Sequence, residues 1–197
     1  MAAAQASRVK TRDRMVFSAI ELMRERGSAG VTIDAILTRS EAPRGSVYYH
    51  FPAGRNQIIA EALEGSSKAI SALIESAIAD GPIEGLRRIR AFWAQILQAS
   101  DYQAGCPVVA VIAGGGEDEQ QHAQIVADTF QVWQEALLEA LVAEGVARVR
   151  AQSLATMIIS SIEGAVIVCR AERGLTPLDS VIAELEQLIA PAIAQTN

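Results

Sequence analysis

The side chains best suited to chemistry in this 197-residue chain are concentrated in residues 44–52, which read Arg-Gly-Ser-Val-Tyr-Tyr-His-Phe-Pro. This short stretch holds a guanidinium, a hydroxyl, two phenols and an imidazole. These groups can hydrogen-bond to the base edges and phosphate oxygens of DNA. The stretch therefore predicts the second, DNA-reading helix of a helix-turn-helix motif, and we call residues 44–51 the reading segment.

Several residues in and beside the reading segment have a predicted DNA contact. Arg44 can bind guanine O6 and N7 with two hydrogen bonds, although a phosphate contact explains it nearly as well. Thr32 and Arg55 open the flanking helices, whose N-termini favour phosphate, and Thr32 equally suits a plain N-cap. Gly45 lets the backbone approach the duplex closely, or is only a first-turn residue of low helix propensity. The predicted DNA-binding residues are Thr32, Arg44, Gly45, Ser46, Tyr48, Tyr49, His50 and Arg55.

A reading helix this short must also bury one face. Val47 and Phe51 stand four residues apart and supply that face. Tyr48 lies next to it, so we expect the Tyr48 ring to be half-buried, whereas Tyr49 and His50 should point outward.

The remaining reactive residues do not predict catalysis. Cys106 and His122 could act as nucleophile and base, but the sequence offers neither an orienting third group nor an oxyanion hole, so we expect no enzyme. The two histidines and two cysteines stand singly, so we expect no metal site and no cofactor, and we expect both cysteines to be buried and unbridged. The glycines of residues 114–116 lack the Lys-Ser/Thr of a phosphate loop and predict a flexible connection.

Charge is distributed unevenly along the chain. The net charge is −6, which by itself argues against DNA binding. Residues 1–60, however, hold nine Lys and Arg against five Asp and Glu, while residues 61–197 hold eight against eighteen. A basic N-terminal third on an acidic body indicates phosphate binding at one end.

The elements that must position these groups are helical. Half of the residues are hydrophobic, helix-forming residues dominate, and no strand alternation occurs. Thr32 begins a helix that ends near Ser40, and Pro43 suits the first turn of the reading helix. The other helices are predicted at residues 9–26, 55–79, 83–100, 108–113, 119–144, 149–173 and 178–194. No apolar run approaches the ~20 residues of a membrane span, and the N-terminus lacks a signal-peptide pattern, so we expect a cytoplasmic protein without membrane contact.

Residues 11–63 resemble the tetracycline-repressor (TetR) family of bacterial one-component regulators. The resemblance rests on Arg26-Gly27, on the Thr-Ile-Asp-Ala-Ile entry at residues 32–36, on the reading segment, and on the Arg-Asn-Gln-Ile-Ile start at residues 55–59. Residues 105–108, Gly-Cys-Pro-Val, are similar to a subgroup related to multidrug-efflux repressors. One residue departs from the family pattern. Glu41 stands in the turn where the family often has Gly, so the turn should be strained or shaped differently.

The resemblance implies an all-α fold of about nine helices, with an N-terminal three-helix helix-turn-helix head on a larger ligand-binding and dimerisation body. We place the DNA-binding domain at residues 1–55 and the body at residues 56–197, with the boundary near the start of a shared long helix. The resemblance also implies that the last two long helices pair with those of a second subunit in a four-helix bundle.

Aromatic residues spread over three predicted helices of the body suggest a cavity for a flat or hydrophobic ligand. An ordinary hydrophobic core explains them at least as well. Polar groups interrupt these apolar helices and could orient a guest, and Glu163 could select a cation or simply face solvent. The predicted ligand-binding residues are Phe92, Trp93, Phe130, Trp133, Gln134, Met157, Ser161 and Glu163.

The last two predicted helices carry apolar stripes that are wider than packing within one subunit requires. The stripes are Met157, Ile158, Ile162, Val166 and Cys169, then Val181, Ile182, Leu185, Leu188, Ile189 and Ile193. A homodimer would present two reading helices ~34–36 Å apart to a near-palindromic operator.

We therefore expect a regulator, most simply a repressor, that a small hydrophobic or amphipathic effector releases from its DNA. An activator of the same fold, or a helical small-molecule-binding protein with a vestigial head, is the alternative.

Overall fold

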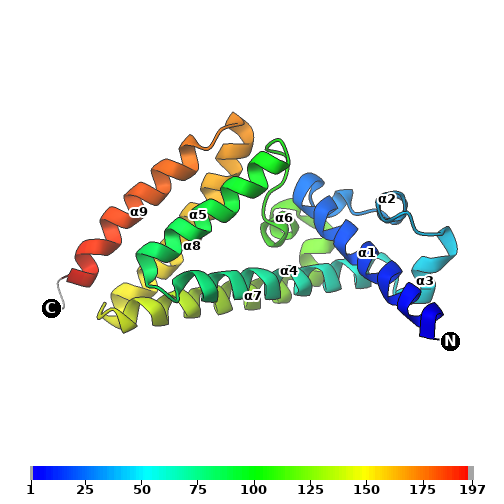
Figure 1. Cartoon of the computed structure of the whole chain (residues 1–197), viewed down its shortest axis with the longest axis horizontal. Coiled ribbons are helices and arrows are strands. Elements are labelled where there is room, and N and C mark those ends of the chain that lie inside the picture. Colours follow the sequence, from blue (N-terminus) through cyan, green and yellow to red (C-terminus); the bar gives the residue numbers. More distant parts are fainter. Residues whose placement is uncertain (1, 195–197) are drawn as a thin grey trace. The chain divides into compact units, whose positions relative to one another are not determined.

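The structure is a computed structural model that describes the backbone of residues 2–194 and the side chains of residues 11–193. Over these residues the chain forms nine α-helices, two short 3-10 helices and no strand, which confirms the predicted all-α fold (Figure 1). The helices are α1 (Ala2–Arg26), α2 (Ile33–Ser40), α3 (Val47–His50), α4 (Arg55–Ile78), α5 (Pro82–Ala99), α6 (Pro107–Gly114), α7 (Gly116–Ala143), α8 (Arg148–Glu172) and α9 (Thr176–Ala194); the 3-10 helices are η1 (Ser28–Gly30) and η2 (Arg44–Ser46).

Glycine and proline set several of the helix boundaries. Gly27, Gly81 and Gly115 have φ values of 73°, 97° and 66°, a backbone region that side chains with a Cβ rarely adopt. Pro82 and Pro107 occupy the first turns of α5 and α6, where the missing N–H is not needed for the helix ladder. The predicted helices agree in number and order with those observed. Their ends differ by at most four residues, except that α1 begins at Ala2 and not near residue 9.

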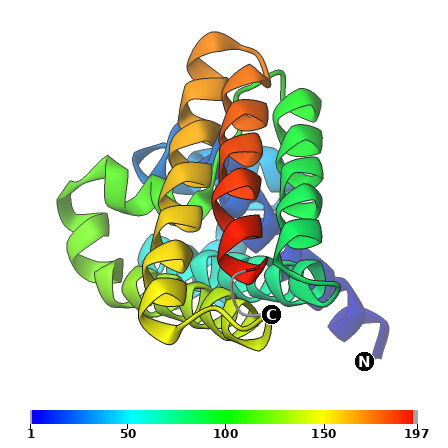
Figure 2. The ribbon, with the colours of Figure 1, turned by 90° about the vertical axis from the view of Figure 1, so that its left-hand side faces the viewer.

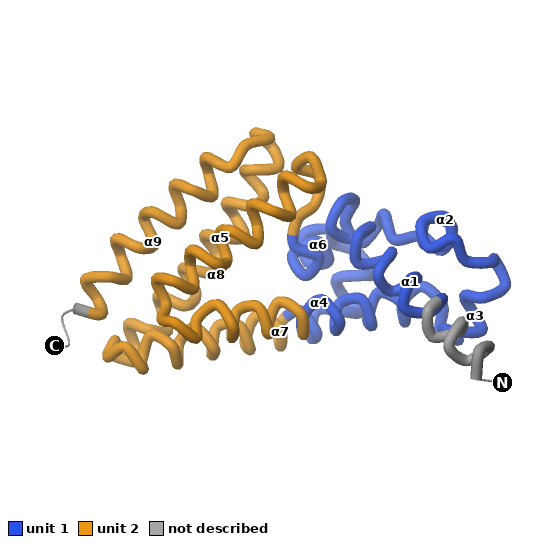
Figure 3. The backbone as a smooth tube through the Cα atoms, viewed as in Figure 1, with its two compact units in different colours: residues 1–67, 106–126 blue, residues 68–105, 127–197 orange. Residues whose placement is uncertain are grey.

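The chain divides into two compact units (Figure 3). Unit 1 comprises residues 1–67 and 106–126, and unit 2 comprises residues 68–105 and 127–197. Unit 1 therefore contains α6 and the first turns of α7 as well as the helix-turn-helix. Helices α4 and α7 both begin in unit 1 and end in unit 2. The domain boundary after residue 55 remains a prediction.

Unit 1 has its own hydrophobic core. Helix α1 packs against α2 and α6 and contributes Met15 and Met23, both with no exposed surface. The reading segment anchors itself in this core with Val47 and Phe51, also fully buried, as predicted from their spacing. The core thus holds one face of the reading segment and leaves the other face outward.

Unit 2 is built around α8, α9 and α5, which run alongside one another (Figure 2). Helix α8 is long and apolar enough to cross a membrane, with a mean hydropathy of 1.6 over its most apolar window. The core helix of a soluble protein passes the same test. Nine residues of α8 are buried inside the protein, among them Leu154, Ile158 and Val166, so packing accounts for much of its apolar character.

Candidate nucleic-acid interface and ligand cavity

The helix-turn-helix begins with a side-chain cap. The Ala35 amide donates to Oγ1 of Thr32 at 3.1 Å, so Thr32 is the N-cap of α2. At the other end of α2, Glu41 adopts φ 53° and ψ 37°, the left-handed conformation that favours glycine. The strained turn predicted at Glu41 is therefore present, and the turn keeps the left-handed geometry despite the larger residue. Pro43 then leads into the reading segment.

The reading segment is split between η2 and α3. The side chains of Tyr48 and Tyr49 are 65% and 59% exposed, and the Tyr49 ring meets that of His50 edge-on at 5.0 Å. The prediction of a half-buried Tyr48 is wrong, because the ring leaves the core and lies over Gly54, whose hypothetical Cβ would be 3.3 Å from it. Both side chains are thus largely exposed to solvent.

Two residues at the start of the reading segment are open to solvent. The Arg44 side chain is 90% exposed, and its nearest charged partner is Asp34 of α2, with 3.6 Å between Nη2 and Oδ1. Such an exposed, long ion pair stabilises little and can break readily when DNA binds. A Cβ added to Gly45 would meet nothing within 4 Å, so no neighbour in the protein requires glycine at this position.

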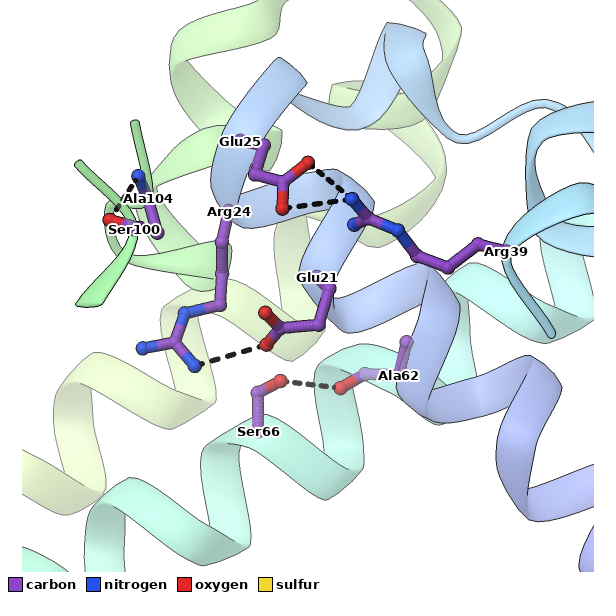
Figure 4. Close-up of polar contacts among 8 residues, drawn as sticks. All are labelled: Glu21, Arg24, Glu25, Arg39, Ala62, Ser66, Ser100 and Ala104. Carbon is purple, nitrogen blue, oxygen red and sulfur yellow. Dashed lines mark hydrogen bonds and ion pairs between the residues drawn. The ribbon is translucent and has the colours of Figure 1, made fainter. Parts of the chain in front are cut away.

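Ion pairs brace the helices around the motif. Arg39 of α2 donates two hydrogen bonds to Glu25 of α1, at 2.9 and 2.7 Å (Figure 4). Arg12 of α1 binds Glu61 of α4 in the same way and lies 4.9 Å above the ring of Phe51. These contacts fix α1, α2 and α4 relative to the reading segment.

Arg55 makes contacts that the sequence does not reveal. Its guanidinium donates to both carboxylate oxygens of Asp118, at 2.6 and 2.8 Å, and to the backbone oxygens of Val31 and Ser28, at 2.6 and 2.8 Å. The Arg55 hydrogen bond holds the pKa of Asp118 below its ordinary value. The phosphate contact predicted for Arg55 is untested, but the structure occupies this guanidinium with internal partners.

Unit 2 contains a small apolar cavity of about 40 Å³. It is smaller than the 300–1,000 Å³ typical of ligand sites and takes at most one or two waters. Its lining consists of one acidic residue and eleven apolar ones. They are Ile70, Leu73 and Ile74 of α4, Ile89, Phe92 and Trp93 of α5, Trp133 and Leu137 of α7, and Ile158, Ile159, Ile162 and Glu163 of α8.

Four of the predicted ligand-binding residues line this cavity: Phe92, Trp93, Trp133 and Glu163. The indole N–H of Trp133 donates to Ser71 Oγ at 3.1 Å, so Trp133 offers a guest its apolar ring. The aliphatic members of the wall were missed. Their only signal was helical spacing, which any core residue shares.

The other four predicted ligand-binding residues lie elsewhere. Phe130 is half-buried and packs edge-on against Trp133 at 5.3 Å, outside the cavity wall, and Gln134 is also absent from that wall. Met157 and Ser161 line an open groove of about 450 Å³ along α8 and α9. Their predicted ligand contact is untested, but they do not line the cavity, because Ile158 and Ile162, one residue on in each case, occupy the inward face of α8.

Within the two predicted dimer stripes, some residues are buried in the subunit and others line the groove. Ile158, Ile162, Val166 and Cys169 are buried within the subunit, as are Ile182, Leu185 and Ile189. Burial raises the pKa of the Cys169 thiol. The outward face is formed instead by Met157 and Ser161 of α8 with Val181, Glu184 and Leu188 of α9. Gly164 belongs to this outward face too, since a Cβ there would meet nothing within 4 Å.

Comparisons with known proteins match both parts of the chain. Residues 18–62 match a family model described as "Bacterial regulatory proteins, tetR family". Residues 82–184 match one described as "Transcriptional regulator LmrA/YxaF-like, C-terminal domain". The HTH-type transcriptional regulator Rv0196 of Mycobacterium tuberculosis is 38% identical over 191 residues, which are 94% of this chain and 97% of that protein.

Solved structures share the fold at lower identity. The regulatory protein TetR from Rhodobacter sphaeroides superposes with a TM-score of 0.79 at 19% identity, covering 89% of this chain and 96% of that one. A cysteine mutant of the TetR-family regulator CifR, complexed with 26-bp double-strand operator DNA, gives a TM-score of 0.71 at 16% identity, with 94% and 96% covered.

Proposed function

Because the chain belongs to the TetR family of bacterial transcriptional regulators, we propose that it is a repressor that a small apolar molecule releases from its operator. It is a DNA-binding regulator rather than an enzyme, and regulators of this family are typically ligand-responsive repressors that act as dimers. One observation carries the ligand response. Helices α4 and α7, which line the cavity in unit 2, both begin in the unit that holds the reading segment. The protein would act in the cytoplasm, where its operator is.

The DNA interface in this proposal is the outward face of the helix-turn-helix. Arg44 reads bases, Tyr48, Tyr49 and His50 share base and phosphate contacts, and Gly45 allows close approach of the backbone. Thr32 and Ser46 lie at helix starts and contact phosphates. The proposed DNA-binding domain is residues 1–55, and the body is residues 56–197.

The proposed dimer forms through the outward faces of α8 and α9. Apolar side chains there remain uncovered in the single subunit, including Met157 at 48% and Val168 at 43% exposure. Ser161 and Gly164 are small, so two helices could approach closely between these apolar residues. An exposed apolar face of this kind marks a protein interface.

The chemistry of the cavity wall limits the effector. Trp93 and Trp133 offer flat apolar surfaces, and Glu163 is the one ionisable residue among the lining residues. An anionic group would meet no cation there and would be repelled by Glu163. The proposed effector is therefore a neutral or cationic molecule, mostly apolar, with a hydrogen-bond donor for Glu163.

Binding must enlarge the cavity, because about 40 Å³ cannot hold such a molecule. Enlargement displaces the walls, and α4 and α7 are two of them. A bound ligand therefore favours one arrangement of α4 and α7, and the ligand-free protein favours another. The two arrangements need not bind DNA equally well. The proposed mechanism is this shift in population.

The test starts with DNA. Selection of tight-binding duplexes from a random pool should yield near-palindromes with half-sites about one turn apart. Neutral, cationic and anionic members of one aromatic series are then added to the complex. Release by the neutral or cationic members and not by the anion supports the proposal.

The alternative functions give other outcomes. No enriched sequence would favour a helical binding protein with a vestigial head. A selected site that activates a downstream promoter in a reporter strain would favour an activator. Release by the anionic member alone would refute the proposed effector class.

A further inference from the structure

The ion pair of Arg55 and Asp118 joins three segments of unit 1. Arg55 is the first residue of α4, and Asp118 lies in the first turn of α7. The same guanidinium donates to the carbonyl oxygens of Ser28 in η1 and of Val31, next to the N-cap of α2. The side chains of Arg55 and Asp118 are only 28% and 12% exposed, so water competes weakly for this contact. The pair therefore fixes the start of α4 against the entry to the helix-turn-helix.

A buried histidine lies one helical turn beyond Asp118. His122 is 5% exposed, and its Nε2 atom has no hydrogen-bond partner among the described residues. The charges that act on it are those of Asp118 on its own helix and Arg55 on α4. Burial, and to a smaller extent the Arg55 charge, lowers the pKa of His122, whereas Asp118 opposes that shift. The lowered pKa favours the neutral form of His122 in the folded protein.

Protonation of His122 would change the balance of charge in this site. One carboxylate would then face two cations, the guanidinium of Arg55 and the new imidazolium. The imidazolium attracts Asp118 and repels Arg55, so both effects weaken the ion pair. Arg55 would then be held only by its hydrogen bonds to the carbonyl oxygens of Ser28 and Val31.

We infer that Asp118 is a positioning residue for DNA binding, and that protonation of His122 releases the Arg55 contact through which Asp118 holds the head. Operator affinity should then fall on acidification, independently of any ligand in the cavity. The inference goes beyond ligand-induced release and needs only that the head binds DNA.

The pH window follows from the direction of the shift. The pKa of His122 is lower in the folded protein than its ordinary value of about 6.5. The unfolded chain therefore binds more protons below that pH, and the His122 contribution to stability is complete above about 6.5 and lost as the pH falls below it. A single coupled proton can change affinity by at most about tenfold per pH unit.

The second histidine of the chain is removed so that His122 can be tested alone. The protein has two histidines, His50 and His122. His50 lies in the reading segment, so replacing it separates any direct effect of this side chain on DNA from the effect of His122. The experiment measures operator affinity by fluorescence anisotropy at fixed ionic strength, from about pH 7.5 to 5.5, for the wild type, His50→Gln, His122→Gln and the double variant.

His50→Gln leaves His122 as the only histidine, and its operator affinity should fall as the pH drops through the His122 titration, which lies below 6.5 in the folded protein, by no more than about tenfold per pH unit. His122→Gln should lack this fall in affinity, and the double variant supplies the baseline. Asp118→Asn should bind more weakly at every pH and lose the His122-dependent slope. A His50→Gln affinity that follows the double variant at all pH values would overturn the inference.

Thermal unfolding of the same four proteins separates this inference from the proposed function. His122→Gln should flatten the loss of stability below pH 6.5 even if no operator is found. Should His122→Gln lower stability equally at every pH, His122 would be an ordinary core residue and the inference would be wrong.

Discussion

At the scale of the residue, the outward face of the reading segment carries side chains that lie mostly in solvent. Arg44 has one weak partner in Asp34, and Tyr48 and Tyr49 turn away from the core. Each of these side chains can thus be exchanged without disturbing the packing that Val47 and Phe51 provide. Substitutions there should separate DNA binding from folding.

Arg44→Ala should weaken operator binding by about 1–3 kcal/mol and relax the preference at one or two base pairs, if the guanidinium binds guanine with two hydrogen bonds. Binding titrations on the operator and on single-base variants measure both effects. Asp34→Asn is the matched control, since it removes the ion pair and leaves Arg44 in place. Equal loss on operator and on random DNA would reassign Arg44 to a phosphate.

Gly45→Ala should leave the fold intact, because the added methyl meets no protein atom within 4 Å. Operator affinity should nevertheless fall, since the methyl would stand where the duplex approaches closely. Thermal unfolding and operator titration of one sample give the two readouts. Unchanged affinity would mean that the DNA does not approach residue 45 closely.

At the scale of the element, the sequence predicted what local chemistry determines. The N-cap at Thr32, the left-handed turn at Glu41 and the anchoring pair of Val47 and Phe51 all depend on neighbours within a few residues. Arg55 was assigned to phosphate from its place at a helix start, and its contact with Asp118 was missed because the two residues are 63 apart in sequence. Helical spacing alone cannot reveal such a contact.

The same limit applies to the body. Met157 and Ile158 look alike in an apolar helix, yet one faces outward and the other lines the cavity. The rotation of α8 about its axis depends on how α5 and α9 pack against it. The sequence therefore predicted the aromatic part of the cavity wall and Glu163, but it could not show that Met157 and Ser161 face outward.

Glu41→Gly tests the strain in the turn. A residue with a Cβ in the left-handed region costs about 1–2 kcal/mol, and glycine loses about 0.5–1 kcal/mol more backbone entropy on folding. The net expectation is a gain in stability of about 0.5–1 kcal/mol. Denaturant unfolding measures it, and Glu41→Ala, which keeps the strain, should show no gain. A destabilised Glu41→Gly would mean that the carboxylate makes a contact worth more than the strain.

At the scale of the whole molecule, the proposed dimer depends on the outward faces of α8 and α9. Leu188→Glu would place a charge in the groove without entering the core, so it should yield folded monomers. Ile189→Glu cannot serve, because Ile189 is fully buried within the subunit. Val132→Glu on α7, where the valine is 51% exposed, is the matched control. Sedimentation velocity reports the mass, and a dimeric Leu188→Glu would place the interface elsewhere.

The coupling between cavity and operator should be reciprocal. If a ligand weakens operator binding by some factor, the operator must weaken ligand binding by the same factor. Both tryptophans of the chain line the cavity, so ligand binding should change their fluorescence. Leu73→Phe should fill the small cavity, keep operator affinity and abolish release, whereas Val132→Phe at an exposed site should respond like the wild type. The operator is titrated into ligand-bound protein, and ligand into operator-bound protein, at one salt concentration. A compound could still release DNA from Leu73→Phe without changing the fluorescence of either tryptophan. That result would show that the effector binds outside this cavity.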